Sequence, residues 1–191
     1  MMHAALCICA LIPRLVTRSR LVLLVHYREA RKPTNTGQLA ARCLANSRVA
    51  IIGDRARPLA LPLVADGERA VLLYPSDDAV PLVATDLPTT VVVPDGNWRQ
   101  AAKMGRRVPG LDTLPRVTLA DPRPTEYRLR AEPQAHGLAT FEAIARAWRV
   151  LEGETVEDAM MAVFRVMVSR TLWSRGAIGA DAVVGGLPSA L

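Results

Sequence analysis

Short apolar runs alternate along this chain with longer stretches in which apolar residues recur at helical spacing. The short runs are bounded by Gly, Pro or charged residues, which is typical of buried strands. The predicted strands are 21–25, 49–52, 70–74, 90–93 and 116–119, and the predicted helices are 37–45, 98–107, 140–152 and 155–173. This alternation predicts an α/β fold in which a mostly parallel sheet is flanked by helices on both faces.

The last two predicted helices each carry an apolar stripe. Phe141, Ile144 and Trp148 recur at helical spacing in the first of them, and Met160 and Phe164 do so in the second. Such stripes are typical of helices that pack against a core. We therefore assign no functional role to Trp148.

Residues 91–100 combine a predicted strand, a tight turn and the start of a helix. Asp95 and Gly96 indicate the turn, and Asn97 is expected to cap the helix, with Gln100 completing a capping box. Ligand sites in α/β sheets lie at the carboxyl ends of strands, which makes Asp95 a candidate for acid–base chemistry. The alternative is that Asp95 only stabilises its own turn.

The composition indicates a globular chain that forms one domain over residues 1–191. Half of its residues are hydrophobic and 22% are charged. The formal net charge is +6, and all but two of the 24 basic residues are arginines. Arginine suits phosphates and stacked bases better than lysine does. A codon bias explains the same composition equally well. Only the placement of the arginines can therefore indicate whether they bind phosphates or bases.

The apolar segment 4–12 lacks the basic n-region and the small-residue cleavage site of a signal peptide. No apolar run reaches the ~18 residues that a membrane-spanning helix needs. Three cysteines do not form a disulfide framework. We therefore expect a soluble cytoplasmic protein without a membrane partner.

Arg99, Lys103 and Arg106 share one face of the predicted helix that follows Asn97, because they are spaced at i, i+4 and i+7. A solvated surface would explain this face. However, it begins one turn from Asp95, at the expected ligand end of the sheet, which favours contact with phosphates.

A second basic segment precedes the third helix. Arg128 and Arg130 alternate with apolar residues, so an extended backbone would place both on one side. Thr140 is the expected N-cap of the helix, and the helix dipole explains Glu142 in its first turn. The N-terminus of this helix is also a natural site for a ligand carboxylate. His136, in the loop before it, is a minor ligand candidate.

Other candidate sites have simpler explanations. His26 and Glu29 form either an acid–base pair or a loop contact that positions a turn, and we favour the turn. Cys7 and Cys9 supply only half of a zinc site, and Cys43 is expected to be a buried side chain. The GxGxxG, P-loop, HExxH and GxSxG motifs are absent, which argues against the nucleotide-binding and hydrolase chemistries that depend on them.

Seven segments, taken in order, resemble the DTW-domain family, whose bacterial members are similar to tRNA-uridine aminocarboxypropyltransferases. Together they extend over nearly the whole chain, and in register they are specific. They are Cys7-x-Cys9, His26-x-x-Glu29, Asn35-Thr36-Gly37, Tyr74-Pro75-x-x-Asp78-Ala79, Asp95-Gly96-Asn97-Trp98-Arg99-Gln100-Ala101-x-Lys103-Met104, Tyr127-Arg128-Leu129-Arg130 and Leu138-Ala139-Thr140-Phe141-Glu142-Ala143.

The resemblance implies a SPOUT-like fold with a C-terminal trefoil knot that binds S-adenosylmethionine. It also implies transfer of the 3-amino-3-carboxypropyl group of S-adenosylmethionine to N3 of a uridine in tRNA, with no metal needed for the chemistry. The expected cofactor-binding residues are Trp98, Leu119, Gly137, Leu138 and Thr140. The expected tRNA contacts are Arg99, Lys103, Arg106, Arg128 and Arg130. Asp95 is the expected base, and Trp98 either walls the pocket, stacks on the uridine or only packs its helix.

The chain departs from the family pattern at two places. Asn97 stands where the family has Thr, and since both residues cap helices we expect the turn to persist. The CxxC pair that commonly precedes C-x-C is absent, so we interpret residues 1–20 as the remnant of a zinc-binding segment, with no complete metal site. The alternatives are a SPOUT-class RNA methyltransferase, a catalytically silent tRNA-binding module and transfer to ribosomal RNA. The choice between monomer and homodimer stays open.

Overall fold

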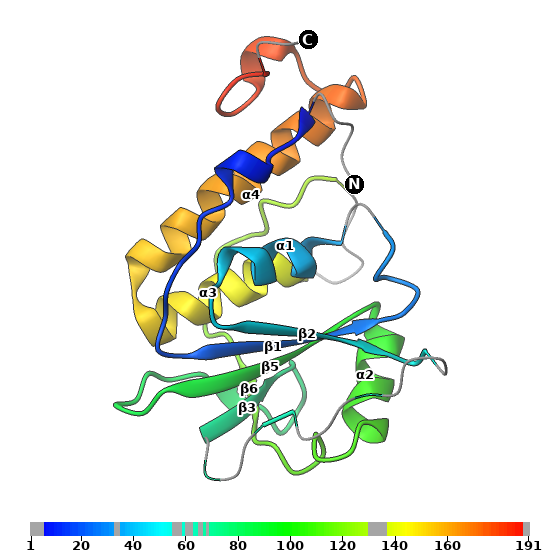
Figure 1. The fold of residues 1–191 in the computed structure, drawn as a ribbon, viewed down its shortest axis with the longest axis vertical. Coiled ribbons are helices and arrows are strands. Elements are labelled where there is room, and N and C mark those ends of the chain that lie inside the picture. Colours follow the sequence, from blue (N-terminus) through cyan, green and yellow to red (C-terminus); the bar gives the residue numbers. More distant parts are fainter. Residues whose placement is uncertain are drawn as a thin grey trace.

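The computed structural model describes residues 6–32, 35–54, 59, 63–64, 67, 69–129 and 137–188. Within these residues a six-stranded sheet forms the centre of the molecule (Figure 1), and all of its strand pairs are parallel. The strand order is β2-β1-β5-β3-β6-β4. In chain order the strands are β1 (Arg20–His26), β2 (Ser47–Ile52), β3 (Arg69–Leu73), β4 (Val80–Pro81), β5 (Thr89–Asp95) and β6 (Arg116–Thr118).

The neighbouring strands β1 and β5 are buried along almost their whole length. Their apolar side chains alternate between the two faces of the sheet, as the period of a strand requires. Leu23 and Val93 are register partners, and the pairing ends at Val25 opposite Asp95. Since the strands are parallel, the turns that follow β1 and β5 lie at the same edge of the sheet.

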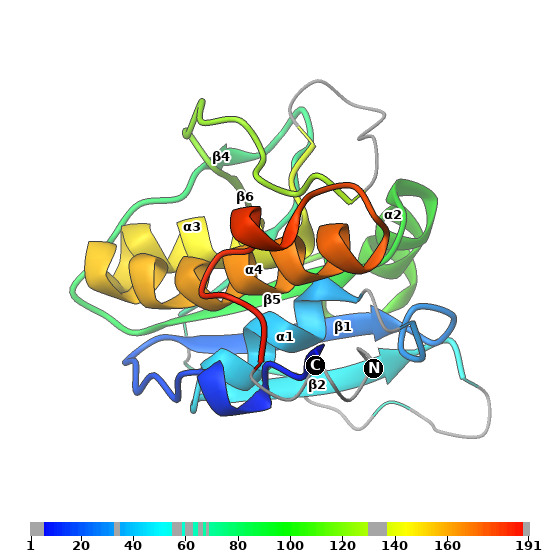
Figure 2. The ribbon, with the colours of Figure 1, turned by 90° about the horizontal axis from the view of Figure 1, so that it is seen from above.

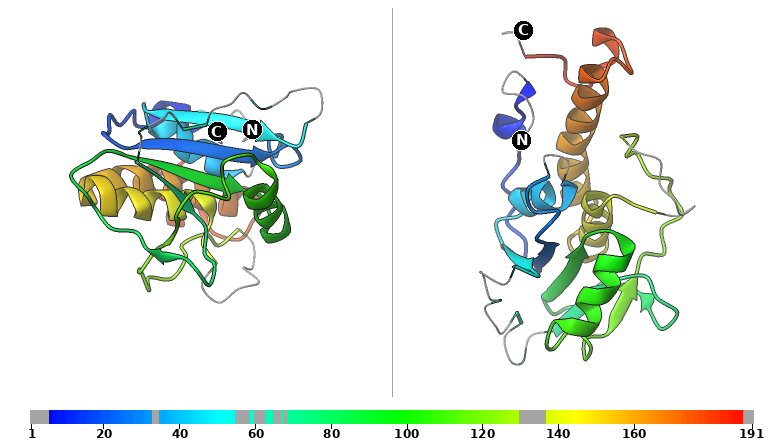
Figure 3. Two further views of the ribbon diagram at one scale, coloured as in Figure 1. Left: turned by 90° about the horizontal axis from the view of Figure 1, so that it is seen from below. Right: turned by 90° about the vertical axis from the view of Figure 1, so that its right-hand side faces the viewer.

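Helices cover both faces of the sheet, as the sequence pattern predicts. The helices are α1 (Thr36–Cys43), α2 (Trp98–Arg107), α3 (Thr140–Glu152) and α4 (Glu154–Ser174), with two short 3-10 helices, η2 (Cys9–Leu11) and η3 (Ala180–Ala182). Figures 1 and 3 show α1, α3 and α4 on one side of the sheet and α2 on the other, and Figure 2 looks down on the side with α1, α3 and α4. Helix α3 packs between α1 and α4.

Each face of the sheet has its own hydrophobic core. Phe141, Trp148 and Phe164 lie in the larger core, between the sheet and the three helices on that side. Trp148 is fully buried and donates its indole N–H to the Thr17 hydroxyl, so its predicted packing role is confirmed. The smaller core joins Val92 and its neighbours to Met104 of α2.

The predicted elements are all present, with small differences at their ends. Helix α1 stops at Cys43 rather than at residue 45, and β6 stops at Thr118. Strand β4 was not predicted, because its two residues are too short to show a period. None of the helices in the described part of the chain is long and apolar enough to cross a lipid bilayer.

Candidate active site

A cavity of about 700 Å³ opens at the carboxyl edge of the sheet. Its walls are the ends of β3, β5 and β6, the loop 121–125 and the first turns of α2 and α3. This is the edge at which α/β sheets bind ligands, and the volume lies within the roughly 300–1,000 Å³ of small-molecule sites.

All five residues expected to bind a cofactor line this one cavity. They are Trp98, Leu119, Gly137, Leu138 and Thr140. They come from α2, the end of β6 and the start of α3, so only the folded chain brings them together. Trp98 is 36% exposed, and its ring meets the Tyr74 ring edge-on, with 6.2 Å between centroids. Tyr74 lines the cavity as well, beside Trp98.

Asp95 lies immediately beside the cavity. Its neighbours Pro94 and Gly96 are lining residues, whereas its own side chain is buried and turned toward α1 and α3. Its Oδ1 accepts a hydrogen bond from the Thr140 hydroxyl at 2.6 Å, and its Oδ2 accepts one from the Asn35 amide at 2.5 Å. Thr140 therefore stands between the carboxylate and the cavity.

The segment Asn35-Thr36-Gly37 is built around this carboxylate. Asn35 caps α1 with its Oδ1 while its amide binds Asp95. A Cβ on Gly37 would lie 3.0 Å from both Cγ and Oδ2 of Asp95, so a side chain at this position would require the carboxylate to shift. The Thr36 hydroxyl accepts the Phe141 N–H of α3 at 3.4 Å. The motif thus ties α1, β5 and α3 together at one point.

Asn97 caps α2 as expected. Its side-chain oxygen accepts the Gln100 N–H at 2.9 Å, and the Gln100 side chain accepts the Asn97 N–H at 2.8 Å. The capping box is therefore complete, and it fixes where α2 begins beside the cavity. Asn97 itself lines the cavity.

The start of α3 differs from the prediction. The N-cap is Ala139, and Thr140 is the first helical residue, because its hydroxyl is used by Asp95. Glu142 is fully buried and accepts hydrogen bonds from the Thr125 hydroxyl and from the N–H groups of Glu126 and Ala139. The anion site at this N-terminus is thus occupied by Glu142, which organises the loop rather than only complementing the helix dipole.

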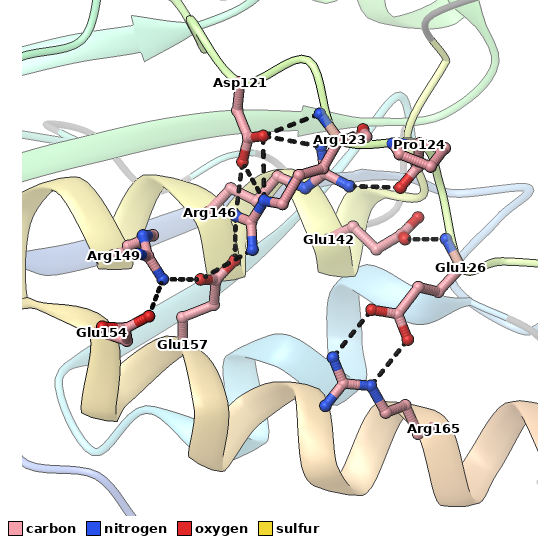
Figure 4. A network of polar contacts seen from close by, with 10 residues as sticks. All are labelled: Asp121, Arg123, Pro124, Glu126, Glu142, Arg146, Arg149, Glu154, Glu157 and Arg165. Carbon is pink, nitrogen blue, oxygen red and sulfur yellow. Dashed lines mark hydrogen bonds and ion pairs between the residues drawn. The ribbon is translucent and has the colours of Figure 1, made fainter.

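A network of charged side chains holds the loop 121–125, which forms one wall of the cavity (Figure 4). The sequence pattern did not predict this network. Arg146 of α3 is 5% exposed and donates to the carbonyl oxygens of Arg123 and Pro124 at 2.7 and 2.8 Å. Asp121 pairs with the Arg123 guanidinium, whose hydrogen bonds lower the pKa of Asp121 to about 2. Glu157 of α4 accepts a hydrogen bond from the Arg123 guanidinium. The loop is therefore anchored to both helices.

The basic face of α2 is exposed, as expected. Arg99, Lys103 and Arg106 form no ion pair with any other residue that the structure describes. Burial lowers the pKa of His26, and the charges of Arg28 and Lys103 lower it further.

The second basic segment is only partly described. Arg128 is exposed and lies in a turn, not in the extended segment that the alternation predicts. Tyr127 just before it is buried, and its ring stacks on that of Phe164 in α4. Arg130 and His136 lie outside the described residues.

His26 and Glu29 do not form an acid–base pair. The Glu29 side chain binds Lys32, and the Glu29 N–H donates to the His26 carbonyl, which confirms the turn interpretation. Cys43 is buried, and burial raises the pKa of its thiol to about 12. Cys7 and Cys9 are exposed, and the described part of the chain holds no group of three or more His, Cys, Asp or Glu side chains suited to a metal.

Comparison with known proteins gives a consistent picture. A family model described as the DTW domain matches residues 1–172. A protein of Drosophila melanogaster named tRNA-uridine aminocarboxypropyltransferase 2 is 30% identical over 142 residues, which cover 70% of this chain and 57% of that protein. A protein of the same name from Mus musculus is 27% identical over 176 residues, which cover 85% of this chain and 59% of that protein. The chain thus spans less than two thirds of these relatives. No solved structure matches it.

Proposed function

Because this chain belongs to the DTW-domain family, we propose that it is a transferase that moves the 3-amino-3-carboxypropyl group of S-adenosylmethionine to N3 of a uridine in tRNA. The names of the two relatives support this reaction. The observation that carries the proposal is the single cavity lined by Trp98, Leu119, Gly137, Leu138 and Thr140, with the exposed basic face of α2 beside it.

The cavity fits the donor in size and in chemistry. Leu119, Gly137 and Leu138 offer apolar walls and backbone groups, which suit a nucleoside. When bound, S-adenosylmethionine supplies a sulfonium that makes each attached carbon electrophilic, so orientation in the pocket selects the carbon that is attacked. We propose that Trp98 and Tyr74 form the aromatic wall on which the donor or the target uridine stacks.

Asp95 is the proton acceptor in this proposal, and it acts through Thr140. As uridine N3 forms a bond to the carbon of the donor, the bond from this carbon to sulfur breaks and 5′-methylthioadenosine leaves. The proton on N3 has to leave in the same reaction. Thr140 lines the cavity, and in this proposal its hydroxyl oxygen receives the proton while its own proton passes to Oδ1 of Asp95. The amide of Asn35 holds the other carboxylate oxygen. This arrangement is supported by the 2.6 Å contact between Thr140 and Asp95.

The tRNA lies along α2 in this proposal. Arg99, Lys103 and Arg106 are free to contact backbone phosphates, and Arg128 is exposed and able to make a further contact. The contact proposed for Arg130 rests on the sequence alone, because this residue lies outside the described part of the chain. The α2 face begins at Asn97, which lines the cavity, so phosphates held there would bring a uridine to the donor.

The remaining expectations belong to the same proposal. We propose a SPOUT-like single domain with a C-terminal trefoil knot, acting in the cytoplasm as a monomer or homodimer. The all-parallel sheet supports the fold, because β5 is inserted between β1 and β3 and the chain has to cross the sheet repeatedly. No metal takes part in the proposed reaction.

The test is mass spectrometry of nucleosides from unmodified tRNA incubated with the protein and S-adenosylmethionine. A uridine heavier by one aminocarboxypropyl group, formed only when both are present, is the expected product. Uridine heavier by one methyl group would instead identify a SPOUT-class methyltransferase. Binding of tRNA with unchanged nucleosides would identify a silent binding module.

A further inference from the structure

The N-terminus of α3 does not offer a site for a ligand carboxylate. Glu142 already accepts the Ala139 N–H there, and Asp95 lies beside the first residue of the helix. Two buried acids at this point disfavour a third carboxylate, because like charges repel strongly where water is excluded. A carboxylate on a ligand in this cavity has to be bound elsewhere.

The charged side chains that line the cavity within the described residues all belong to one wall. They are Asp121, Arg123 and Arg146, and Figure 4 shows them together where the loop 121–125 meets α3. Every other described lining residue is neutral. Among the described lining residues, a charged group of a ligand therefore finds charged partners on this wall alone.

This wall offers both signs of charge. A guanidinium has five N–H donors. The two carbonyl oxygens of Arg123 and Pro124 engage Arg146, and Oδ1 of Asp121 lies 3.8 Å from its Nη1. Asp121 is ionised at neutral pH, because its pKa is lowered to about 2. Arg146 thus has donors to spare for a carboxylate, and Asp121 is an acceptor for an ammonium group.

The wall is also held rigidly and is close to neutral. Arg123 is bound from behind by Glu157, which is 2% exposed, and Glu157 is bound in turn by Arg149. The charges of Asp121 and Glu157 balance those of Arg123 and Arg146. A neutral wall with separate positive and negative points fits a zwitterion better than a phosphate.

We propose that Asp121 and Arg146 bind the α-amino and α-carboxylate groups of an amino-acid end of the ligand, so that this wall is the zwitterion subsite of the cavity. The inference rests on the proposed function, in which the donor is S-adenosylmethionine. It fixes the orientation of the donor, because its methionine end points to the loop 121–125 and its adenosine to the walls at Leu119 and Leu138.

The test compares two ligands by isothermal titration calorimetry, without any turnover. S-adenosylmethionine has the amino-acid end, and 5′-methylthioadenosine lacks it. The expected result is that Arg146→Met weakens binding of S-adenosylmethionine roughly 10- to 100-fold, because a charge-assisted hydrogen bond is lost. Binding of 5′-methylthioadenosine should stay unchanged. Asp121→Asn, which keeps the shape of the side chain, should show the same selective loss.

Arg165→Met is the matched control. Arg165 pairs with Glu126, is exposed and lies outside the cavity, so both affinities should be unchanged. Equal losses for both ligands in Arg146→Met and Asp121→Asn would overturn the inference, because they would mean that the wall only shapes the cavity. If thermal unfolding shows that Arg146→Met does not fold, Asp121→Asn decides.

The wild-type protein separates this inference from the proposed function. If it binds S-adenosylmethionine no better than 5′-methylthioadenosine, the subsite is wrong while the reaction stands. If it binds neither ligand, the proposed donor is wrong, and the subsite fails with it.

Discussion

The hydroxyl of Thr140 donates to Oδ1 of Asp95 at 2.6 Å and joins the first residue of α3 to the last residue of β5. Thr140 lines the cavity, whereas Asp95 is buried behind it. In the proposed reaction, this pair allows the buried carboxylate to act on a ligand in the cavity. Substitutions of Asp95 and of Thr140 each test this role.

Asp95→Asn should reduce turnover on tRNA by about 100-fold or more, which is the usual contribution of a positioned general base. The affinity for S-adenosylmethionine should change little, because Asp95 does not line the cavity. Single-turnover kinetics and calorimetry measure the two quantities separately. Wild-type turnover in this variant would exclude Asp95 as the proton acceptor.

Thr140→Val keeps the shape of the side chain and removes the hydroxyl, so it should lose turnover to a similar extent. Thr140→Ser keeps the hydroxyl and serves as the control, with turnover near that of the wild type. The double variant Asp95→Asn/Thr140→Val should be no slower than the slower single variant, because both changes interrupt one proton path. Additive losses would contradict the relay.

Gly37→Ala should lower turnover, because the added Cβ would lie 3.0 Å from Oδ2 of Asp95 and displace the carboxylate. Gly105→Ala in α2 is the matched control. No atom lies within 4 Å of the added Cβ there, and alanine stabilises a helix interior by up to about 1 kcal/mol relative to glycine. Turnover assays on both variants check this, and equal turnover in the two would argue that Asp95 tolerates displacement.

Replacing Arg99, Lys103 and Arg106 together by Gln should weaken tRNA binding and leave S-adenosylmethionine binding unchanged. Each lost phosphate contact should reduce the slope of log K against log salt concentration by about 0.7–0.9. Filter binding over a range of salt concentrations measures this slope. Arg165→Gln on α4 is the control and should leave the slope unchanged, and an unchanged slope in the triple variant would rule out this face as the tRNA contact.

Asn97→Ala should lower the free energy of unfolding by about 1 kcal/mol, because it removes the cap of α2. Asn97→Thr restores the family residue and should keep both stability and turnover, since Thr also caps helices. Thermal unfolding and turnover assays compare the variants. A large gain in turnover with Thr would show that the family hydroxyl does more than cap the helix.

Asp121 should stabilise the protein in a defined pH range. Its pKa is about 2 in the folded protein and roughly 3.9 in an unfolded chain, so its ionised form favours folding above pH ~4. This contribution should disappear as the pH falls from ~4 to ~2. Asp121→Asn should flatten the curve of unfolding free energy against pH in this range. A curve that keeps the wild-type slope between pH ~4 and ~2 would contradict the pairing of Asp121 with Arg123.

The elements, and the edge of the sheet at which the cavity opens, could be predicted because their signals are local or periodic. The capping box of Asn97 and Gln100 lies within four consecutive residues, and it marks the start of α2 correctly. Trp98, Leu119 and Leu138 lie at the ends of elements on one edge of a parallel sheet, where the resemblance and the sheet geometry agree.

The contacts that organise the site could not be predicted, because their partners are far apart in the sequence. Arg123 binds Glu157 across 34 residues, and Asp95 binds Thr140 across 45. The position of Glu142 in the first turn of α3 is already explained by the helix dipole. Nothing in the sequence therefore indicated its contacts with Thr125 and Glu126. Such partners are set by which loop reaches which helix, and only the tertiary structure fixes that.

The central claim is tested most directly with two samples of S-adenosylmethionine, one labelled in the methyl group and one labelled in the aminocarboxypropyl chain. Each is incubated with the protein and unmodified tRNA, and the label in uridine is then measured by mass spectrometry. The account predicts that only the chain label enters uridine, and that Asp95→Asn slows this transfer by about 100-fold or more. Entry of the methyl label, or of neither label, would contradict it.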